Sequence, residues 1–513
     1  MPASQTLASL LEHTCRGVPD RTAIDDLDHG AVTYAQLFEG STRLARALGE
    51  IGVVAGDRVG LCAPKSNGVV TAIFAILQAG AAYVPVDPTA PARRCAFIFS
   101  NCAVRALVVD RKLFAKLAEE MSGTTCKVVG PVEVPGATGL DLVLVACTHA
   151  SDAPMSAPPD LAYILYTSGS TGVPKGVMHS NSTALGFVDW CSQEFAPTPE
   201  DRFSSHAPFH FDLSIFDLFV CVKHGGALTL IGEERGKTPL QLSSLIEDRR
   251  LTIWYSTPSI LRLMVEYGKL AERDCRALRL VLYAGEVFPP KHQRSLRTIW
   301  PHPAYYNLYG PTETNVCTYD RVDRVPEERA GTPLSIGRPC SGDRTRAVDP
   351  DGREVPKGQE GELVVAGASV MLGYWNLPEQ NGRAFLDADG ARWYRTGDLV
   401  VDQNGEYLFL GRRDRMVKRR GYRVELGEIE AALTRHEHIN EAAVVALPDA
   451  DSGVLIKAFV SWTGETKPSL IALKTFAAGN LPNYMVPDRF TVLPELPKTS
   501  TDKIDYQKLK EHA

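Results

Sequence analysis

The sequence has few of the features that mark membrane or secreted proteins. No run approaches the ~20 consecutive apolar residues that a membrane-spanning helix needs. The first twenty residues lack the basic start, the apolar core and the small-residue cleavage site of a secretory signal. We therefore expect a cytoplasmic protein that has no membrane partner.

Paired or clustered cysteines are also missing. The eleven cysteines are an odd number, are scattered singly, and form no C-x-x-C pair or Cys/His group with zinc-like spacing. We predict that they are reduced thiols, mostly small residues of the core.

A strong excess of one charge is absent too. The net charge of -6 over 513 residues leaves no basic stripe, so a nucleic-acid partner is not indicated. The 44% of apolar residues is ordinary for a globular protein. Because the chain is longer than one hydrophobic core usually supports, we expect a large layered domain and at least one smaller one.

Short β-rich apolar runs alternate with helix-like stretches up to about residue 412. Examples are Val59–Cys62, Ala81–Val86, Leu107–Val109, Leu142–Val145 and Ala162–Tyr166. This alternation predicts α/β layers of helices and largely parallel sheets.

Two later runs, Gly361–Val365 and Tyr407–Leu410, are bounded by turn residues and show little helical periodicity between them. They predict a hairpin-rich, β-barrel-like subdomain. A basic stretch from Arg412 to Arg423 then leads into an acidic helix start at Glu425. We predict an N-terminal domain of residues 1–412 and a small α+β domain of residues 413–513.

The strongest local signal is the segment from Tyr166 to Gly176, Y-T-S-G-S-T-G-V-P-K-G, directly after an apolar strand. Its glycines let backbone N–H groups approach an anion, its hydroxyls add donors, and its lysine adds positive charge. The alternative interpretation is a flexible surface loop. We predict that polyphosphate is bound by Thr167, Ser168, Gly169, Ser170, Thr171, Gly172 and Lys175.

At this segment the sequence resembles the ANL superfamily, which contains acyl-CoA synthetases, luciferases and nonribosomal peptide synthetase adenylation domains. Further motifs of that superfamily follow its order along the chain at Ala79–Pro88, Asn307–Thr314, Tyr394–Leu399, Gly411–Asp414 and Gly421–Glu430. The resemblance implies an enzyme that uses ATP to convert a carboxylic acid to an acyl-adenylate and then passes the acyl group to a thiol.

The same resemblance assigns the adenosine contacts. Tyr309 stacks on adenine, and the edge of the base faces Asn307 and the turn of Ala284, Gly285 and Glu286. Asp398 accepts hydrogen bonds from both ribose hydroxyls, and Arg412 approaches the ribose and phosphate. Taken singly, a tyrosine is more often a core residue, and an aspartate after a glycine is more often a turn residue.

The phosphate contacts are assigned in the same way. Thr312 contacts phosphate and Glu313 holds Mg²⁺, a hard cation that needs oxygen ligands. An isolated Thr-Glu pair is otherwise a common helix start.

The C-terminal segment Leu496–Asp505 resembles the last motif of the superfamily and implies that Lys503 is the catalytic lysine. Its ammonium group bridges the substrate carboxylate and the α-phosphate as they react. The superfamily usually has Asn-Gly before this lysine, whereas Thr501 and Asp502 stand here. Asp414 lies at the superfamily's hinge position, so the small domain is expected to rotate between an adenylation pose and a thioester pose.

Asp212, within Phe209–Phe216, indicates the class of acid. In amino-acid-activating relatives an aspartate here pairs with the α-ammonium group. The alternative is a helix N-cap before Leu213. We favour an amino acid substrate.

The side-chain pocket implied by the motifs contains Leu213, Phe216, Tyr255, Ser256, Leu282, Ala284, Leu308, Gly310, Val316 and Cys317. It has no charge besides Asp212 and Lys503, so a charged side chain would be buried without a partner. The pattern is similar to that of stand-alone prolyl-adenylating ligases of natural-product biosynthesis, apart from Phe216, where a smaller residue is usual. L-Proline is the expected substrate.

No carrier-domain serine motif and no condensation-type His-His motif follow in the sequence. We expect the acceptor to be the phosphopantetheine thiol of a separate peptidyl carrier protein, with free coenzyme A as the main rival. Two other readings stay open: an acyl-CoA ligase for a non-amino acid, and a nucleotide-binding regulatory protein without catalysis. The joint presence of Lys175, Glu313, Asp398 and Lys503 argues against the second.

Overall fold

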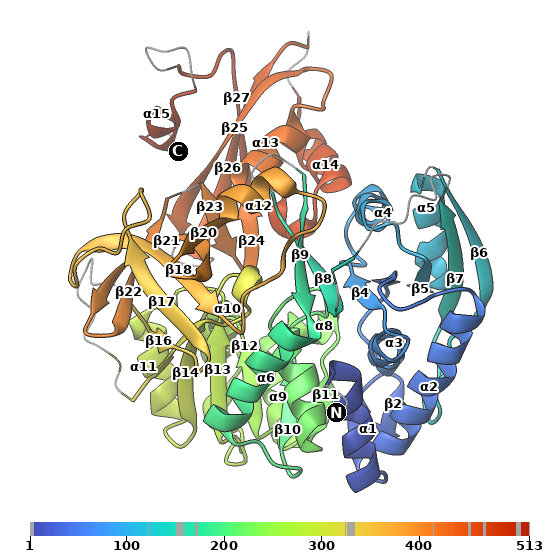
Figure 1. Ribbon diagram of the computed structural model, residues 1–513. Coiled ribbons are helices and arrows are strands. Elements are labelled where there is room, and N and C mark those ends of the chain that lie inside the picture. Colours follow the sequence, from blue (N-terminus) through green and yellow to red (C-terminus); the bar gives the residue numbers. More distant parts are fainter. Residues whose placement is uncertain are drawn as a thin grey trace.

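The computed structural model describes residues 5–121, 123–149, 157–158, 160–169, 173–323, 325, 334–413, 415–449, 453–464, 468–498 and 504–511. These residues form two large sheets with helices packed on them and a smaller unit at one end (Figure 1). The prediction of a mixed α/β protein is confirmed.

The first sheet has eight strands, and its centre is parallel. In spatial order they are β19 (Gly373–Tyr374), β9 (Lys175–Ser180), β8 (Leu161–Thr167), β4 (Ala82–Pro85), β3 (Arg58–Cys62), β5 (Ala106–Asp110), β7 (Leu142–His149) and β6 (Thr124–Pro131). Its helices are α2 (Tyr34–Glu50), α3 (Asn67–Gln78), α4 (Ala92–Asn101) and α5 (Arg111–Glu120).

Helix α3 joins the two layers. Residues 67–77 are all buried, as expected for a helix that has apolar residues on every side. The Ser66 side chain accepts a hydrogen bond from the N–H of Val69 and so caps its start. The ring of Phe74 packs edge-on against Phe219 of the second layer, with 5.8 Å between centroids. The core is therefore continuous between the two sheets.

The second sheet has fourteen strands. In order they are β17 (Asp343–Val348), β18 (Glu360–Gly367), β21 (Ala391–Gln403), β22 (Glu406–Arg412), β16 (Leu334–Pro339), β15 (Thr318–Arg321), β14 (Ala304–Tyr309), β13 (Leu280–Ala284), β12 (Ile253–Ser256), β10 (Arg202–Ser205), β11 (Ala227–Leu230), β1 (Thr22–Asp26) and β2 (Gly30–Thr33), with β20 (Phe385–Ala388) paired to β21. From β14 to β1 the pairing is parallel, whereas β15 to β22 form antiparallel hairpins. The predicted hairpin-rich region is therefore present, and it continues the second sheet.

The remaining helices of these layers are α1 (Leu7–Gly17), α6 (Asn181–Phe195), α7 (Cys221–His224), α8 (Glu233–Gly236), α9 (Pro239–Asp248), α10 (Pro258–Tyr267), α11 (Pro290–Ile299) and α12 (Pro378–Ala384). A π-helical turn over Phe216–Val220 precedes α7.

The C-terminal unit is α+β, as predicted. Its elements are the hairpin β23 (Met416–Arg419) and β24 (Tyr422–Glu425), the sheet β25 (Ile439–Asp449), β26 (Gly453–Trp462) and β27 (Arg489–Leu493), and the helices α13 (Leu426–Leu433), α14 (Leu470–Asn480) and α15 (Tyr506–Glu511). Ile429, Val444 and Ile456 belong to a buried core of its own. In Figure 1 this unit lies above the two sheets, and the β23–β24 hairpin points down toward them.

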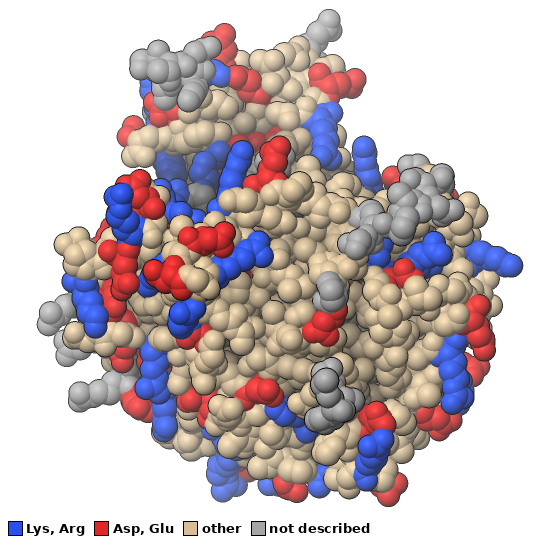
Figure 2. Space-filling model, in the orientation of Figure 1, with Lys and Arg blue, Asp and Glu red and all other residues tan. Residues whose placement is uncertain are grey.

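All eleven cysteines are free thiols, and all except Cys15 and Cys126 are buried, which confirms the prediction. Acidic and basic side chains are interspersed over the face shown in Figure 2, and uncharged residues cover much of its centre. Within the described ranges, no helix combines the length and the apolar character needed to cross a bilayer.

Candidate active site

The site lies at the carboxyl ends of the parallel strands β12, β13 and β14. Their register pairs Ser256 with Tyr283 and Ala284 with Leu308, so all three strands end at one edge. Ligands of parallel α/β sheets usually bind at that edge. The motif segments that follow these strands are therefore brought together although they are distant in sequence.

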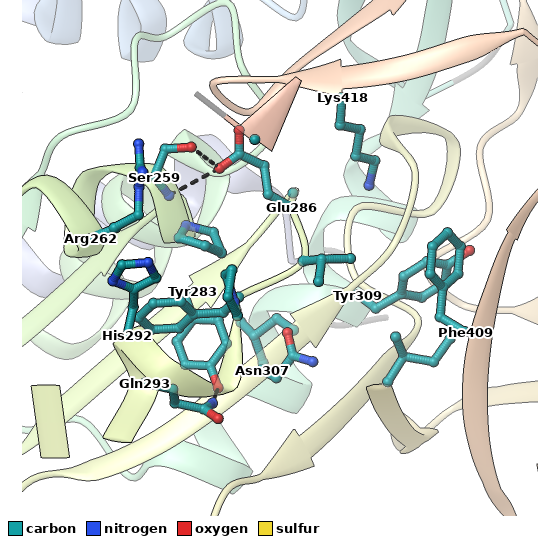
Figure 3. A pocket seen from close by; sticks show the side chains of 18 of the residues that line it. Ser259, Arg262, Tyr283, Glu286, His292, Gln293, Asn307, Tyr309, Phe409 and Lys418 are labelled. Carbon is teal, nitrogen blue, oxygen red and sulfur yellow. Dashed lines mark hydrogen bonds between the residues drawn. The ribbon is translucent and has the colours of Figure 1, made fainter. Parts of the chain in front are cut away.

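A cavity of about 750 Å³ opens at this edge, between the second sheet and the C-terminal unit. Figure 3 shows Tyr309 and Phe409 on one side of it, Ser259 and His292 on the other, and Asn307 between them. Asn307 donates a hydrogen bond of 2.9 Å to the carbonyl of Ser335. The cavity has an aromatic wall and polar groups at its base, which suits a nucleoside.

A carboxylate lies beside the aromatic wall. Asp398 is buried, and it accepts hydrogen bonds from the hydroxyl of Tyr309 and, at 2.6 Å, from Arg412. Two of the residues predicted to contact adenosine, Tyr309 and Arg412, therefore both bind a third, Asp398. A carboxylate has two oxygens with several lone pairs, so it can accept hydrogen bonds from a guanidinium group and from hydroxyl donors.

The turn after β13 connects this cavity to the C-terminal unit. Gly285 has a φ of +91°, and Glu286 follows it. The Glu286 carboxylate accepts a hydrogen bond of 3.0 Å from the N–H of Ser259 (Figure 3). It also accepts one of 2.7 Å from the N–H of Gly421. A Cβ on Gly421 would lie 2.3 Å from the Thr257 side chain, so only glycine allows this close approach.

A second, smaller cavity of about 40 Å³ adjoins the first and contains Asp212. The side chain of Asp212 is 9% exposed. Burial raises the pKa of this carboxyl to about 6, while the Thr312 hydroxyl that donates to it and the nearby Lys418 act in the opposite direction. Among the described residues Asp212 forms no ion pair.

The structure places the predicted pocket residues in three groups. Those that line the small cavity are Leu213, Tyr255, Ala284, Gly310 and Val316, and Leu308 lines the larger cavity. Phe216, Ser256, Leu282 and Cys317 are buried and border neither cavity; the Phe216 ring packs edge-on against Tyr255. As substrate contacts, all of these remain predictions.

Glu313 lies in a 3₁₀ turn over Thr312–Thr314 and is fully buried. Its carboxylate pairs with Arg423 at 2.9 Å and accepts a hydrogen bond of 2.6 Å from the Tyr374 hydroxyl. Burial alone would raise the pKa of Glu313, but Arg423 and Lys175 outweigh burial and lower the pKa to about 2. Glu313 is therefore an anion that needs a cation beside it.

The predicted phosphate loop is described at both ends, and Ser170, Thr171 and Gly172 lie outside the described residues. Thr167 ends β8, and Lys175 begins β9 with its ammonium group 5.1 Å from the Tyr374 ring. A Cβ on Gly169 would lie 1.9 Å from the carbonyl oxygen of Val173, so the turn requires glycine. The N–H of Gly169 and the hydroxyl of Ser168 both contact the C-terminal unit.

Lys503 and Asp414 also lie outside the described residues, so their predicted roles stay predictions. Ile504 forms an isolated β-bridge with Lys498, and the Tyr506 hydroxyl donates to Glu430 of α13. These contacts hold the segment after residue 503 on the C-terminal unit. In Figure 1, α15 lies at the outer side of that unit.

Sequence reasoning missed several residues that line the small cavity, among them Phe187, Phe211, Asn315, Lys418 and Arg423. The prediction that Asp212 and Lys503 are the only charged groups there is wrong, because Lys418 and Arg423 enter from the β23–β24 hairpin. Burial lowers the pKa of Lys418. The basic stretch from Arg412 to Arg423 was the available signal, and it indicated only the start of a domain.

The family of the chain follows from sequence comparison. Residues 11–375 match the AMP-binding enzyme family, and residues 428–503 match the AMP-binding enzyme C-terminal domain. The chain belongs to the AMP-binding enzyme family, and the resemblance found in its motifs is confirmed. Enzymes of this family use ATP.

Two relatives are L-proline–(L-prolyl-carrier protein) ligases. The one from Pseudomonas fluorescens is 40% identical over 96% of both chains. The one from Streptomyces coelicolor is 39% identical over 93% of this chain and 91% of its own length. Both alignments cover nearly the full length of this chain.

Solved structures agree with the fold. The amide bond synthetase McbA from Marinactinospora thermotolerans superposes with a TM-score of 0.85 and is 26% identical, with 99% of each chain covered. An NRPS protein containing adenylation and PCP domains, solved with a vinylsulfonamide inhibitor, superposes with a TM-score of 0.79 at 26% identity over 99% of this chain and 84% of its own.

Proposed function

We propose that this protein activates L-proline with ATP and then transfers the prolyl group to the phosphopantetheine thiol of a separate peptidyl carrier protein. The proposal depends mainly on Asp212, a buried carboxylate in the small cavity that adjoins the larger cavity suited to a nucleoside. Among the described residues no cation forms an ion pair with Asp212, and an unpaired buried carboxylate is costly. The ammonium group of an amino acid supplies the missing positive charge, which a simple carboxylic acid lacks.

In the first step a carboxylate oxygen of proline forms a bond to the α-phosphorus of ATP, and the bond from that phosphorus to pyrophosphate breaks. Tyr309, Asp398 and Arg412 hold the adenosine. The cations Lys175 and Lys503 offset the charge that develops around phosphorus. Their positions in the motifs support these roles.

The Glu313 carboxylate fits a Mg²⁺ ion, because it is buried, ionised and already neutralised by a cation in this pose. Mg²⁺ bound there would offset the negative charge of the ATP phosphate oxygens. Thr312, next in the chain, lines the small cavity and is therefore close to the reacting carboxylate.

In the second step the thiol sulfur attacks the carbonyl carbon of the prolyl adenylate, and AMP leaves. The two steps need different poses of the C-terminal domain, which we assign to residues 413–513, hinged at Asp414 to the domain of residues 1–412. The separate core of the C-terminal unit supports this division. We assign the pose of this structure to the thioester step, because Arg423 of the C-terminal unit pairs with the Glu313 carboxylate that would hold Mg²⁺ during adenylation.

Proline as the substrate is supported by the two L-proline ligases among the relatives. The Leu213, Tyr255 and Val316 walls of the cavity suit a compact apolar ring. The secondary ammonium group of proline has two N–H donors for Asp212.

Amino-acid-dependent pyrophosphate exchange tests the proposal. Purified protein with Mg²⁺ and ATP should exchange labelled pyrophosphate with proline well above alanine, valine and pipecolate. A strong preference for another acid would refute the substrate assignment. If no acid supports exchange, the assignment of adenylating activity is refuted and a regulatory nucleotide-binding protein is favoured.

The acceptor is tested separately. Holo carrier protein, its apo form and free coenzyme A should be offered with proline and ATP, and thioester formation followed by mass spectrometry. Only the holo carrier should gain the mass of a prolyl group. Equal transfer to coenzyme A would assign the protein to the acyl-CoA ligases instead.

We predict that proline binding weakens in mild acid. Asp212 binds the ammonium group as a carboxylate, and its raised pKa of about 6 means that ionisation is lost as the pH falls through 6. The neighbouring Glu313 stays ionised, and Lys418 stays close by. The KM for proline at saturating ATP should rise about tenfold between pH 7 and pH 5. A KM that is constant over this range would contradict the assignment of Asp212.

A further inference from the structure

Two residues of the C-terminal unit bind groups that were predicted to bind the metal ion and the phosphates of ATP. The first is Arg423 of β24. Its guanidinium group donates to both carboxylate oxygens of Glu313, at 2.9 and 3.1 Å, and lies 3.4 Å from Glu425. Arg423 thus places its positive charge on the carboxylate that suits a metal ion.

The second is Glu428 of α13. One of its carboxylate oxygens accepts a hydrogen bond of 3.1 Å from the N–H of Gly169, and the other pairs with Arg94 of α4. Its side chain is 3% exposed. An anion from the C-terminal unit therefore occupies a backbone donor of the predicted phosphate loop.

A neighbouring contact uses a second donor of the loop. The Ser168 hydroxyl donates to the carbonyl of Arg423 at 2.7 Å and accepts from the N–H of Glu425 at 3.2 Å. The β24–α13 segment therefore places a cation on Glu313, an anion on Gly169 and backbone groups on Ser168. A bound metal–polyphosphate would likewise place a cation and an anion at this side of the nucleotide site.

We propose that Arg423 and Glu428 are positioning residues that hold the thioester pose by standing in for the metal ion and for a phosphate group. The proposal rests on the proposed function. An N–H group has one hydrogen to donate, so Gly169 cannot serve Glu428 and a phosphate at once. Glu313 likewise cannot keep its two-point contact with Arg423 while a metal ion occupies the same oxygens.

As a consequence, the thioester pose of the C-terminal domain and bound metal–ATP compete for the same groups. Binding of metal–ATP displaces the β24–α13 segment and releases the C-terminal domain for adenylation. Loss of pyrophosphate frees the same groups, and the segment returns for transfer to the thiol. A ligand that binds only one pose has an apparent affinity reduced by the fraction of protein in the other pose.

The experiment measures binding of Mg²⁺ with α,β-methylene-ATP, which cannot be cleaved at the reacting bond, by calorimetry. Glu428→Gln keeps the shape of the side chain and removes its negative charge. Arg423→Gln removes the positive charge that takes the place of the metal ion on Glu313. Each variant should bind the nucleotide about threefold or more tightly, because the competing pose is weakened. Mere structural damage would weaken binding, so a gain is specific to this proposal.

Glu437→Gln is the matched control, because its side chain is 82% exposed on the same unit. It should bind the nucleotide as the unsubstituted protein does. In the transfer half-reaction from preformed prolyl adenylate, the Glu428 and Arg423 variants should be slower by about tenfold, while the control is unchanged.

Hydrogen exchange gives a readout independent of activity. In the unsubstituted protein, Mg²⁺ with the nucleotide should speed exchange in peptides covering residues 422–430, since the N–H of Glu425 loses its Ser168 partner. Unchanged or weaker nucleotide binding in both variants would overturn the proposal while leaving the enzyme assignment intact. Failure of the unsubstituted protein to bind the nucleotide would instead contradict the proposed function, and the proposal with it.

Discussion

Lys503→Ala should lose adenylation by about 10²-fold or more, because no other group would bridge the substrate carboxylate and the α-phosphate as charge develops. Transfer of the prolyl group from preformed prolyl adenylate to the holo carrier should be largely retained. Proline-dependent pyrophosphate exchange measures the first half-reaction, and thioester formation in the absence of ATP measures the second.

Lys498→Ala is the matched control. Lys498 lies five residues earlier in the same segment and pairs with Glu441 at the half-exposed surface of the C-terminal unit. Such pairs contribute little, so both half-reactions should stay within about twofold. Equal loss of both half-reactions in Lys503→Ala would contradict the assignment of the lysine to one pose only.

Asp212→Asn should lower kcat/KM for proline by about 10²- to 10³-fold, because it leaves the buried ammonium group of the substrate without a charged partner. The amide has nearly the same shape, so the cavity stays intact. The KM for ATP should change little, since the nucleoside lies in the larger cavity. Pyrophosphate exchange at varied proline and varied ATP separates the two effects.

Cyclopentanecarboxylate makes this test sharper, because it has the ring and carboxylate of proline but no amine. The unsubstituted protein should discriminate strongly against it, and Asp212→Asn should lose most of that discrimination. Asp189→Asn, in the half-exposed pair with Lys223, is the control and should preserve it. Unchanged discrimination in Asp212→Asn would remove the amino-acid assignment and leave an enzyme for an unspecified small acid.

Sequence patterns predicted the fold because they report local preferences and burial. Apolar runs of strand length identified β3, β5, β7 and β8, and the change in character after residue 412 identified the C-terminal unit. The motifs also selected Asp212, Glu313 and Asp398 as site residues, and the structure shows that all three carboxylates are buried.

The contacts between distant segments could not be predicted in this way. The position of the small cavity depends on the register that brings the ends of β12, β13 and β14 to one edge. Phe216 and Cys317 line neither cavity, although their motifs suggested contact with the substrate. The raised pKa of Asp212 likewise depends on its burial by segments that are remote in sequence.

By itself, the sequence determined the class of the protein, a nucleotide-using α/β enzyme, and it predicted a phosphate loop, a carboxylate for a metal and a carboxylate for an amine. Only the tertiary structure decided that Arg423 neutralises Glu313 and that Glu428 meets Gly169, residues 110 and 259 positions apart. The physical reason is that local patterns record which side chains are available, whereas packing of the C-terminal unit decides which charges meet.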